Sequence, residues 1–391
     1  MVAGALIGAI GAYVVQVLGG RALGPTGFAP VSVIWAMLFI GFTIFMLPIE
    51  QMVIRRVTLA GGGVSSPTVR VVAMVTLAAT VLAGGLAVAV RQSLFVGDWG
   101  YVLVAVALFP VSAVHVVGRG LLAGRERYTA YGAVVAGDAL SKVVGTVLVV
   151  LLGLGGVALC WVLALTPVVV VLARPWRTPR DAVPAGAPPG SDRRFLGGYL
   201  VGTAASQVLL ASGPLVLGAL GASAAAISVY FVTTTLFRGP LSVSYNLMAR
   251  LLPSVTRRAA SEGDHLLSTL VRRAAIGGGV AAGAAGAGAM LVGPWIVQTL
   301  YGQEFRPTAL LAGLAAAAVV VALAALVATQ VLVGRGHTGR LALAWVFGLI
   351  MAVITVISLQ IDPTARVATA LLVGETAALL GLVVASGSPA R

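Results

Sequence analysis

The stretch that decides the fold is LGGRALGPTGFAPVSVIWAMLFIGFTIFMLPIEQMVIRR, from Leu18 to Arg56. An apolar segment ends at Arg21, a Gly24-Pro25-Thr26-Gly27 corner follows, and a second apolar segment runs to the Arg55-Arg56 pair. About 20 apolar residues are enough for a helix to cross the hydrocarbon core of a bilayer. The stretch therefore predicts two adjacent membrane-spanning helices joined by a very short turn.

The composition extends this interpretation to the whole chain. Hydrophobic residues make up 59% of the 391 residues and charged residues only 9%, with a mean hydropathy of +1.06. Soluble domains carry about 25% charged residues, because water must wet their surface. Lipid-exposed backbone must satisfy its own hydrogen bonds, so helices are the expected spanning elements. The sequence predicts an all-α integral membrane protein.

The distribution of apolar runs predicts about twelve transmembrane helices in two sets of six. A Pro-rich segment between the sixth and seventh runs predicts an extended linker. We therefore expect an N-terminal six-helix bundle at 1–175, a cytoplasmic Pro-rich linker at 176–194 and a C-terminal six-helix bundle at 195–391. The runs lie at about 2–20, 28–53, 69–90, 100–118, 129–152, 155–173, 195–218, 224–250, 271–293, 308–333, 341–360 and 365–385. Residues 1–20 lack a basic segment and are interpreted as the first span rather than a signal peptide.

Short sequence similarities, or echoes, relate the two halves of the chain. Gly20–Gly24 before the second run resembles Leu217–Gly221 before the eighth, and Gly124-Arg125 after the fourth resembles Gly334-Arg335 after the tenth. Arg55-Arg56 likewise matches a later arginine pair at 257–258. An even number of helices per repeat gives both halves the same orientation. The echoes predict a 6+6 parallel repeat around a central cavity that carries the substrate.

The basic residues predict the orientation in the membrane. The net charge is +14, and eighteen of the 25 lysine and arginine residues lie in or beside loops that follow even-numbered spans. Four follow odd-numbered spans (Arg21, Arg91, Arg306 and Arg366). Because cytoplasmic loops are enriched in Lys and Arg, we expect a multi-pass protein of the cytoplasmic membrane with both termini inside. This explains the charge without nucleic-acid binding.

The chain lacks the residues that other classes of protein require, such as disulfide-bonded proteins, metalloproteins and nucleotide-binding enzymes. Cys160 is the only cysteine, so no disulfide can form within the chain and no thiolate metal cluster is expected. The only lysine, Lys142, follows no glycine-rich turn, so a phosphate-binding P-loop is absent, and the three histidines form no metal motif. The predicted outer loops are short, which argues against an extracytoplasmic enzyme site. We expect no catalytic residues, no metal and no cofactor.

Four charged residues lie near mid-depth in predicted spans. Asp138 and Lys142 lie about 10 and 14 residues from the cytoplasmic end of their span, or roughly 15 and 21 Å deep. Their i, i+4 spacing places them on one helix face, where they can pair. Arg238, followed by Gly239-Pro240, and Glu375 lie near the middle of the eighth and twelfth spans. Intramembrane charges must face protein or water.

Two interpretations of these charges stay open. In the first, Arg238 and Lys142 line a cationic cavity that binds a lipid pyrophosphate, while Asp138 and Glu375 couple transport to an ion gradient. In the second, Asp138–Lys142 and Arg238–Glu375 are structural pairs that lock helices together.

Further polar residues in or near the predicted spans are weaker candidates for functional or structural roles. Arg21 at the outer mouth, Gln207 and Asn246 are further candidates for the substrate cavity, although helix capping or interhelical hydrogen bonds explain them equally well. Glu50, close to Arg55-Arg56, is expected to form an interfacial ion pair, and His115 to be a packing residue with a satisfied ring. The glycines of span nine are interpreted as devices for close helix packing.

Four motifs in order carry a family resemblance. RALGPTGF at Arg21–Phe28, the basic pair after span two, LLPSV at 251–255 with a following polar stretch, and LYGQEF at Leu300–Phe305 are those motifs. They resemble polysaccharide flippases of the multidrug/oligosaccharidyl-lipid/polysaccharide exporter superfamily over nearly the full length. The chain departs from the pattern in its very short N-terminus and its single lysine. The resemblance implies translocation of a polyprenyl-linked sugar without chemistry on it, with polysaccharide synthesis enzymes as candidate partners.

Three functional hypotheses follow. The first is a flippase for lipid-linked oligosaccharides, with a lipid-linked glycan and membrane lipids as its partners. The second is a drug or cation antiporter of the same superfamily, or another 6+6 carrier. The third is a membrane scaffold for a polysaccharide synthesis complex. The motifs favour the first, and the sequence shows no cation-binding cluster that would favour the second.

Overall fold

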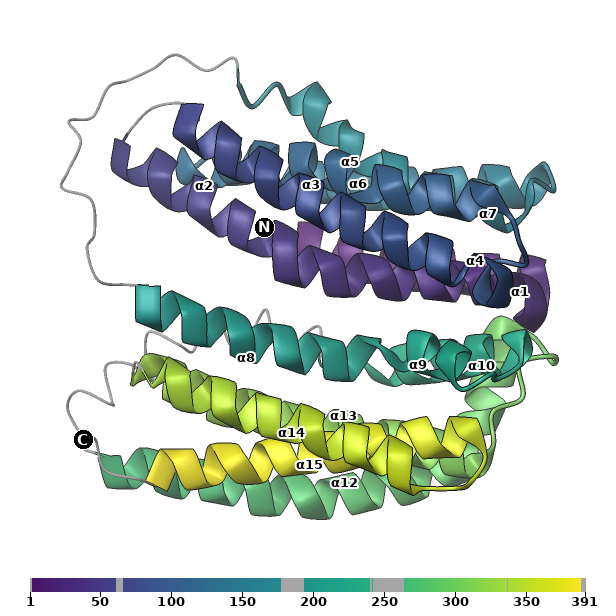
Figure 1. Ribbon diagram of the computed structural model, residues 1–391, viewed down its shortest axis with the longest axis vertical. Coiled ribbons are helices and arrows are strands. Elements are labelled where there is room, and N and C mark those ends of the chain that lie inside the picture. The colour runs from purple at the N-terminus through teal and green to yellow at the C-terminus, as the bar shows by residue number, and fades with distance from the viewer. Residues whose placement is uncertain are drawn as a thin grey trace. The chain divides into compact units, whose positions relative to one another are not determined.

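The structure is a computed structural model that describes residues 2–60, 66–176, 193–239, 241, 264–335 and 337–387. Within these ranges the ordered elements are all helices, and no β-strand occurs (Figure 1). The predicted all-α fold class is therefore confirmed. The chain divides into two compact units, Met1–Pro189 and Gly190–Arg391. The division falls inside the stretch that the sequence assigns to a linker, most of which lies outside the described residues.

The N-terminal unit is built around one central helix. α5 (Trp99–Gly124) contacts most of the other helices of the unit, including α2, α3, α6, α7 and η2. The other elements are α1 (Val2–Gly41), the π-helical η1 (Phe42–Met46), α2 (Leu47–Ala60), α3 (Ser66–Ala89), α4 (Arg91–Leu94), α6 (Tyr128–Leu151), α7 (Gly155–Leu165) and the 3-10 helix η2 (Thr166–Ala173).

The predicted Gly24-Pro25-Thr26-Gly27 corner lies inside α1. At Gly24, a φ of 65° and a ψ of 175° interrupt the helix. A Cβ added at Gly19 would lie 3.2 Å from the ring of Phe28. In one straight helix these positions would be about 13 Å apart along the axis, so the chain reverses between them. The predicted short turn between the first two spans is confirmed.

We expect Gly24→Ala to destabilise the protein by about 1–3 kcal/mol, because the backbone conformation of Gly24 is essentially restricted to glycine. Gly27→Ala is the matched control, since a Cβ there would meet only the Leu23 Cβ at an ordinary 3.4 Å. Thermal unfolding of the detergent-solubilised variants measures both effects. Equal unfolding temperatures for the two variants would contradict the assigned turn.

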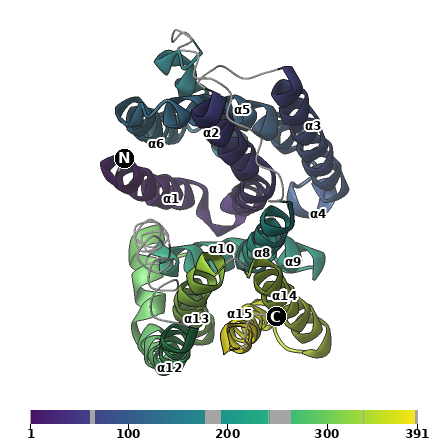
Figure 2. The ribbon, with the colours of Figure 1, turned by 90° about the vertical axis from the view of Figure 1, so that its left-hand side faces the viewer.

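The C-terminal unit has a similar plan. α13 (Ala309–Gly334) contacts α10, α12, α14 and α15 (Figure 2). It contributes many of the buried alanines of the core. Small side chains along α13 let its neighbours approach closely. The other helices are α8 (Arg193–Ala211), α9 (Gly213–Ala219), α10 (Ala224–Phe237), α12 (Asp264–Tyr301), α14 (Thr338–Ser358) and α15 (Pro363–Gly387).

Prolines explain where predicted spans break. The seventh span is divided into α8 and α9 with a 60° bend just before Pro214, and the sixth changes from α-helix to 3-10 helix at Thr166-Pro167. The α10 helix ends at Phe237, two residues before Gly239-Pro240 in the sequence. Proline lacks a backbone N–H and its ring clashes with the preceding helical turn.

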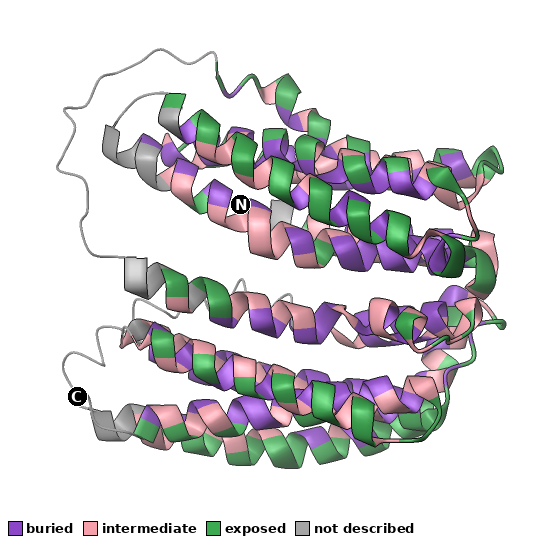
Figure 3. Ribbon diagram, viewed as in Figure 1, coloured by how far each residue is buried: buried purple, intermediate pink, exposed green. Residues whose placement is uncertain are grey.

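The described helices are those of a multi-pass membrane protein. In these residues, nine helices are long and apolar enough to cross a bilayer, or ten if α8 and α9 form one bent span. The first of them, Ile10–Ile54, contains the reversal at Gly24. Large apolar side chains such as Leu291 and Leu343 are exposed. Buried and exposed residues alternate along many of the helices (Figure 3). The number of twelve spans stays a prediction, because the eighth lies partly outside the described residues.

Two of the sequence echoes have the same local structure in both units. Gly24 and Gly221 both adopt a positive φ, of 65° and 73°. Arg125 and Arg335 are the C-caps of α5 and α13, and each guanidinium reaches the end of the last helix of its own unit. Arg125 donates to the Pro175 carbonyl at 2.5 Å, and Arg335 donates to the Ser386 carbonyl at 2.7 Å. This recurrence supports the internal repeat.

Asp362 caps the N-terminus of α15. Its Oδ2 accepts hydrogen bonds from the Thr364 hydroxyl and from the backbone N–H groups of Thr364 and Ala365, the latter two at 3.0 Å. These hydrogen bonds, that of the Thr364 hydroxyl first, hold the pKa of Asp362 below its ordinary value. The carboxylate therefore stabilises the folded state above its unfolded pKa of about 4, and this contribution is lost as the pH falls through the lower folded pKa.

We expect Asp362→Ala to lower the free energy of unfolding by about 1 kcal/mol at pH 7, the usual effect of losing an N-cap. The difference from the parent protein should be smaller at pH 2.5, because a larger fraction of the parent carboxylate is protonated there than at pH 7. Denaturant titrations at both pH values measure it. A difference of the same size at both would show that the charge of Asp362 does not contribute.

Candidate functional site

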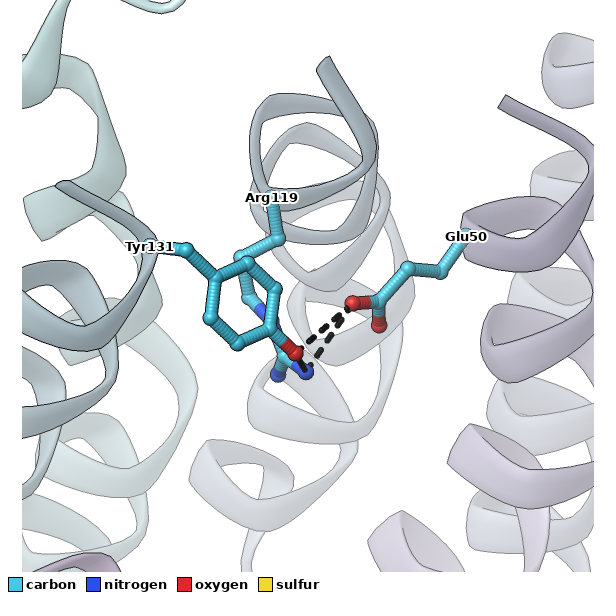
Figure 4. Close-up of polar contacts among 3 residues, drawn as sticks. All are labelled: Glu50, Arg119 and Tyr131. Atoms are coloured by element: carbon cyan, nitrogen blue, oxygen red, sulfur yellow. Dashed lines mark hydrogen bonds and ion pairs between the residues drawn. The ribbon is translucent and has the colours of Figure 1, made fainter. Parts of the chain in front are cut away.

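Three polar side chains meet between helices of the N-terminal unit (Figure 4). Arg119 Nη2 of α5 lies 3.0 Å from Glu50 Oε1 of α2 and 2.5 Å from the Tyr131 hydroxyl of α6. The Tyr131 hydroxyl donates to the same Glu50 oxygen at 3.1 Å. The Arg119 guanidinium also lies over the Tyr131 ring, 4.9 Å from its centroid. Because the Glu50 side chain is only 2% exposed, its charge depends on these partners.

Glycines bring the two charged helices together. A Cβ added at Gly120 would lie 2.8 Å from Val53, and one at Gly124 would lie 2.8 Å from Val57. These glycines are four residues apart and therefore share the face of α5 that contacts α2. The close approach places Arg119, next to Gly120, within reach of Glu50.

This pairing corrects the predicted position of Arg119. The apolar run that ends at residue 118 predicts that Arg119 lies in the loop after the fourth span. The helix instead continues through Leu121-Leu122 to Gly124, and Arg119 lies inside it. The partner expected for Glu50 was Arg55-Arg56, whose side chains lie outside the described part of the chain. The apolar residues that follow Arg119 were the signal that it belongs to the span.

A second group of polar residues lies on α5 and α6 of the same unit. Lys142 Nζ and Asp138 Oδ2 are 2.6 Å apart, so the predicted i, i+4 pair of α6 is confirmed. The buried His115 of α5 donates from Nδ1 to the Pro167 carbonyl at 2.8 Å, which confirms that its ring is satisfied. The charges of Asp138, Lys142 and Arg119 all act on His115. The six polar side chains thus form one electrostatic cluster.

The C-terminal unit holds a separate pair of candidates. Glu375 of α15 is fully buried, and neither of its carboxylate oxygens has a hydrogen-bond partner among the described residues. Arg238 is the half-buried C-cap of α10, and its charge acts on Glu375 and on the Tyr230 hydroxyl. The structure therefore places the predicted Arg238 and Glu375 in one electrostatic environment.

The remaining candidates are Arg21, Gln207 and Asn246. Arg21 is exposed and lies three residues before the Gly24 turn. Gln207 is half-buried in the C-terminal third of α8. Asn246 lies outside the described residues. Among the residues that the structure describes, no group of three or more His, Cys, Asp and Glu side chains could hold a metal ion.

Solved structures define the class of fold. The chain is 15% identical to a multidrug resistance MATE family transporter of the MOP superfamily in its inward-facing conformation, with a TM-score of 0.65 and coverage of 97% of this chain and 93% of that one. It is 16% identical to a MOP superfamily transporter from Pyrococcus furiosus, with a TM-score of 0.59 and coverage of 98% and 95%. The chain therefore has the fold of MATE transporters of the MOP superfamily.

Sequence relatives define the family. The chain is 30% identical over 389 residues to the Uncharacterized protein Rv1510 of Mycobacterium tuberculosis, covering 93% of this chain and 85% of that protein. It is 29% identical over 366 residues to the Uncharacterized protein Rv3630 of the same organism, covering 88% and 81%. No family model matches the chain. It belongs to the family of Rv1510.

Proposed function

We propose that this protein translocates a polyprenyl-(pyro)phosphate-linked oligosaccharide, or a related cell-envelope lipid, across the cytoplasmic membrane by alternating access. Both termini lie in the cytoplasm in this proposal, and the protein performs no chemistry on its substrate. Its partners are the lipid-linked glycan, membrane lipids and polysaccharide synthesis enzymes.

The observation that carries the proposal is the set of charged side chains inside the helices of a transporter fold. Ionisable residues within membrane helices are costly, and they are retained mainly where they serve a substrate or ion pathway. The cationic groups Arg238 and Lys142 suit a phosphate, and an arginine can bind two phosphate oxygens at once. The four sequence motifs that resemble polysaccharide flippases support a glycan lipid as the substrate. Arg21, Gln207 and Asn246 remain candidates for contacting its head group.

A second candidate function is ion-coupled drug export. The structural relative in its inward-facing conformation is a multidrug resistance transporter. In the described chain, Asp138 has one carboxylate oxygen without a hydrogen bond, and Glu375 has two. Carboxylates with open coordination suit a proton or Na⁺, so the same two residues would couple either kind of transport to an ion gradient.

Depletion of the protein in its host tests the proposal. Lipid-linked glycan should accumulate on the cytoplasmic side of the membrane. In intact cells it should therefore be protected from a membrane-impermeant oxidant of sugar diols. Surface glycan should fall in parallel. A lipid-linked glycan pool that keeps its normal size and accessibility after depletion would contradict the proposed function. A rise in drug sensitivity with an unchanged pool would favour the second candidate.

A further inference from the structure

The glycines of α12 correct an expectation from the sequence. An added Cβ would meet nothing within 4 Å at Gly277, Gly279, Gly283 or Gly288. Close packing holds at Gly278, where the Cβ would lie 2.6 Å from that of Ala324, and at Gly286, where it would lie 3.3 Å from the Gly313 carbonyl. Most of the glycines in this span therefore leave space beside the helix instead of drawing a neighbour close.

Part of that space is a groove in the C-terminal unit. The groove has a volume of about 720 Å³ and is lined by α12, α13 and α15. Gly279, Gly283 and Gly286 line it from α12, with Ala317 from α13 and Leu379 from α15. We call it the α12 groove. Its volume is within the range of about 300–1,000 Å³ that is usual for ligand sites.

The α12 groove is apolar along its length and basic at one end. Thr376 faces it from α15, but its hydroxyl donates to the Leu372 carbonyl at 2.7 Å and is therefore already satisfied. Arg272 is the charged residue of the described lining, and it is exposed. An apolar channel with a cationic end is complementary to a hydrocarbon chain that carries an anionic head.

The length of the groove indicates which kind of lipid hydrocarbon chain could fill it. Its α12 lining runs from Arg272 to Met290, which corresponds to about 27 Å of helix. The hydrocarbon core of a bilayer is about 30 Å thick, so an acyl chain confined to one leaflet reaches only about 15 Å. A chain that fills the whole groove must extend across both leaflets, as a polyprenyl chain can.

We propose that the α12 groove binds the polyprenyl chain of a phosphorylated lipid and that Arg272 binds its phosphate. This inference rests on the proposed function. It assigns the polyprenyl chain of the substrate to the α12 groove and adds Arg272 to Arg238 and Lys142 as a candidate for binding its phosphate groups. Arginine suits the phosphate because its planar guanidinium forms two hydrogen bonds to phosphate oxygens.

Photocrosslinking of the full-length protein in phosphatidylcholine nanodiscs tests this assignment. The probe is a long-chain polyprenyl phosphate with a diazirine in the chain, and labelled peptides are identified by mass spectrometry. We expect labelling of α12, α13 and α15. The double variant Gly279→Leu/Gly283→Leu fills the groove and should reduce this labelling at least tenfold. The control Gly277→Leu/Gly288→Leu adds the same side chains at equally open positions outside the groove and should change it less than twofold.

Two further arms test the head group and the chain. Arg272→Gln should weaken labelling by the polyprenyl phosphate about fivefold and leave labelling by the corresponding polyprenol diazirine unchanged. Equal labelling of the filled and control variants would overturn the groove assignment. So would complete competition by equimolar diacyl phosphatidylglycerol, which would identify an ordinary phospholipid site. Because binding is measured without transport, a protein that flips the glycan lipid but is not labelled in the groove would overturn only this inference.

Discussion

Replacing Arg119 with alanine is expected to lower the free energy of unfolding by about 3 kcal/mol. The substitution removes the ion-pair partner of Glu50, whose side chain is only 2% exposed. Removing one partner of a buried ion pair typically costs about 3–5 kcal/mol, because the other charge is left uncompensated. The lower end applies here because the Arg119 side chain is itself 19% exposed.

A double-mutant cycle separates this electrostatic loss from lost packing. Arg119→Met keeps much of the side-chain volume, and Glu50→Gln removes the negative charge. The double variant should recover most of the stability lost in Arg119→Met, because neither charge is then left alone. Tyr131→Phe removes one hydroxyl and should cost only about 1 kcal/mol. Additive effects of Arg119→Met and Glu50→Gln in unfolding titrations would contradict the pairing.

Arg238→Ala is expected to abolish glycan export and to leave the protein inserted and folded. Arg238 is the half-buried C-cap of α10, where its charge acts on Glu375. Alanine removes the cation that the proposed function assigns to the lipid pyrophosphate, while the helix already ends at this position. Surface glycan, measured with a specific lectin, should fall at least tenfold at an unchanged level of membrane protein.

Arg306→Ala supplies the matched control for Arg238. Arg306 is an exposed arginine of the same unit, and its Nε donates to the Gln303 carbonyl at 2.9 Å. Its loss should leave export within twofold of the parent protein. Arg238→Lys keeps the charge without the planar guanidinium and should retain partial activity. Normal surface glycan in cells that carry Arg238→Ala would remove Arg238 from the proposed substrate site.

Hydropathy and local spacing predicted the features that depend on neighbours in the chain. The turn at Gly24 and the Asp138–Lys142 pair are both local, and both are present. The contact between Glu50 and Arg119 was not predictable in this way, because it depends on which faces of two separate helices meet. The close approach at Gly120 and Gly124 decides that contact.

The same limit explains the misinterpreted glycines of α12. A glycine in an apolar run has the same appearance whether a neighbouring helix packs against it or a groove lies beside it. At Gly278 the neighbour is Ala324, whereas at Gly283 no atom comes within 4 Å. Only the positions of the other helices distinguish these cases, and they follow from tertiary packing rather than from the composition of the span.

Transport by the purified protein tests the central claim most directly. Proteoliposomes are loaded with a fluorescent polyprenyl-pyrophosphate-linked oligosaccharide, and its arrival at the opposite leaflet is followed with a membrane-impermeant quencher. We predict protein-dependent movement that is lost with Arg238→Ala and retained with Arg306→Ala. A rate equal to that of protein-free liposomes, under proton and Na⁺ gradients of either direction, would contradict the assignment of this protein as a lipid-linked glycan flippase.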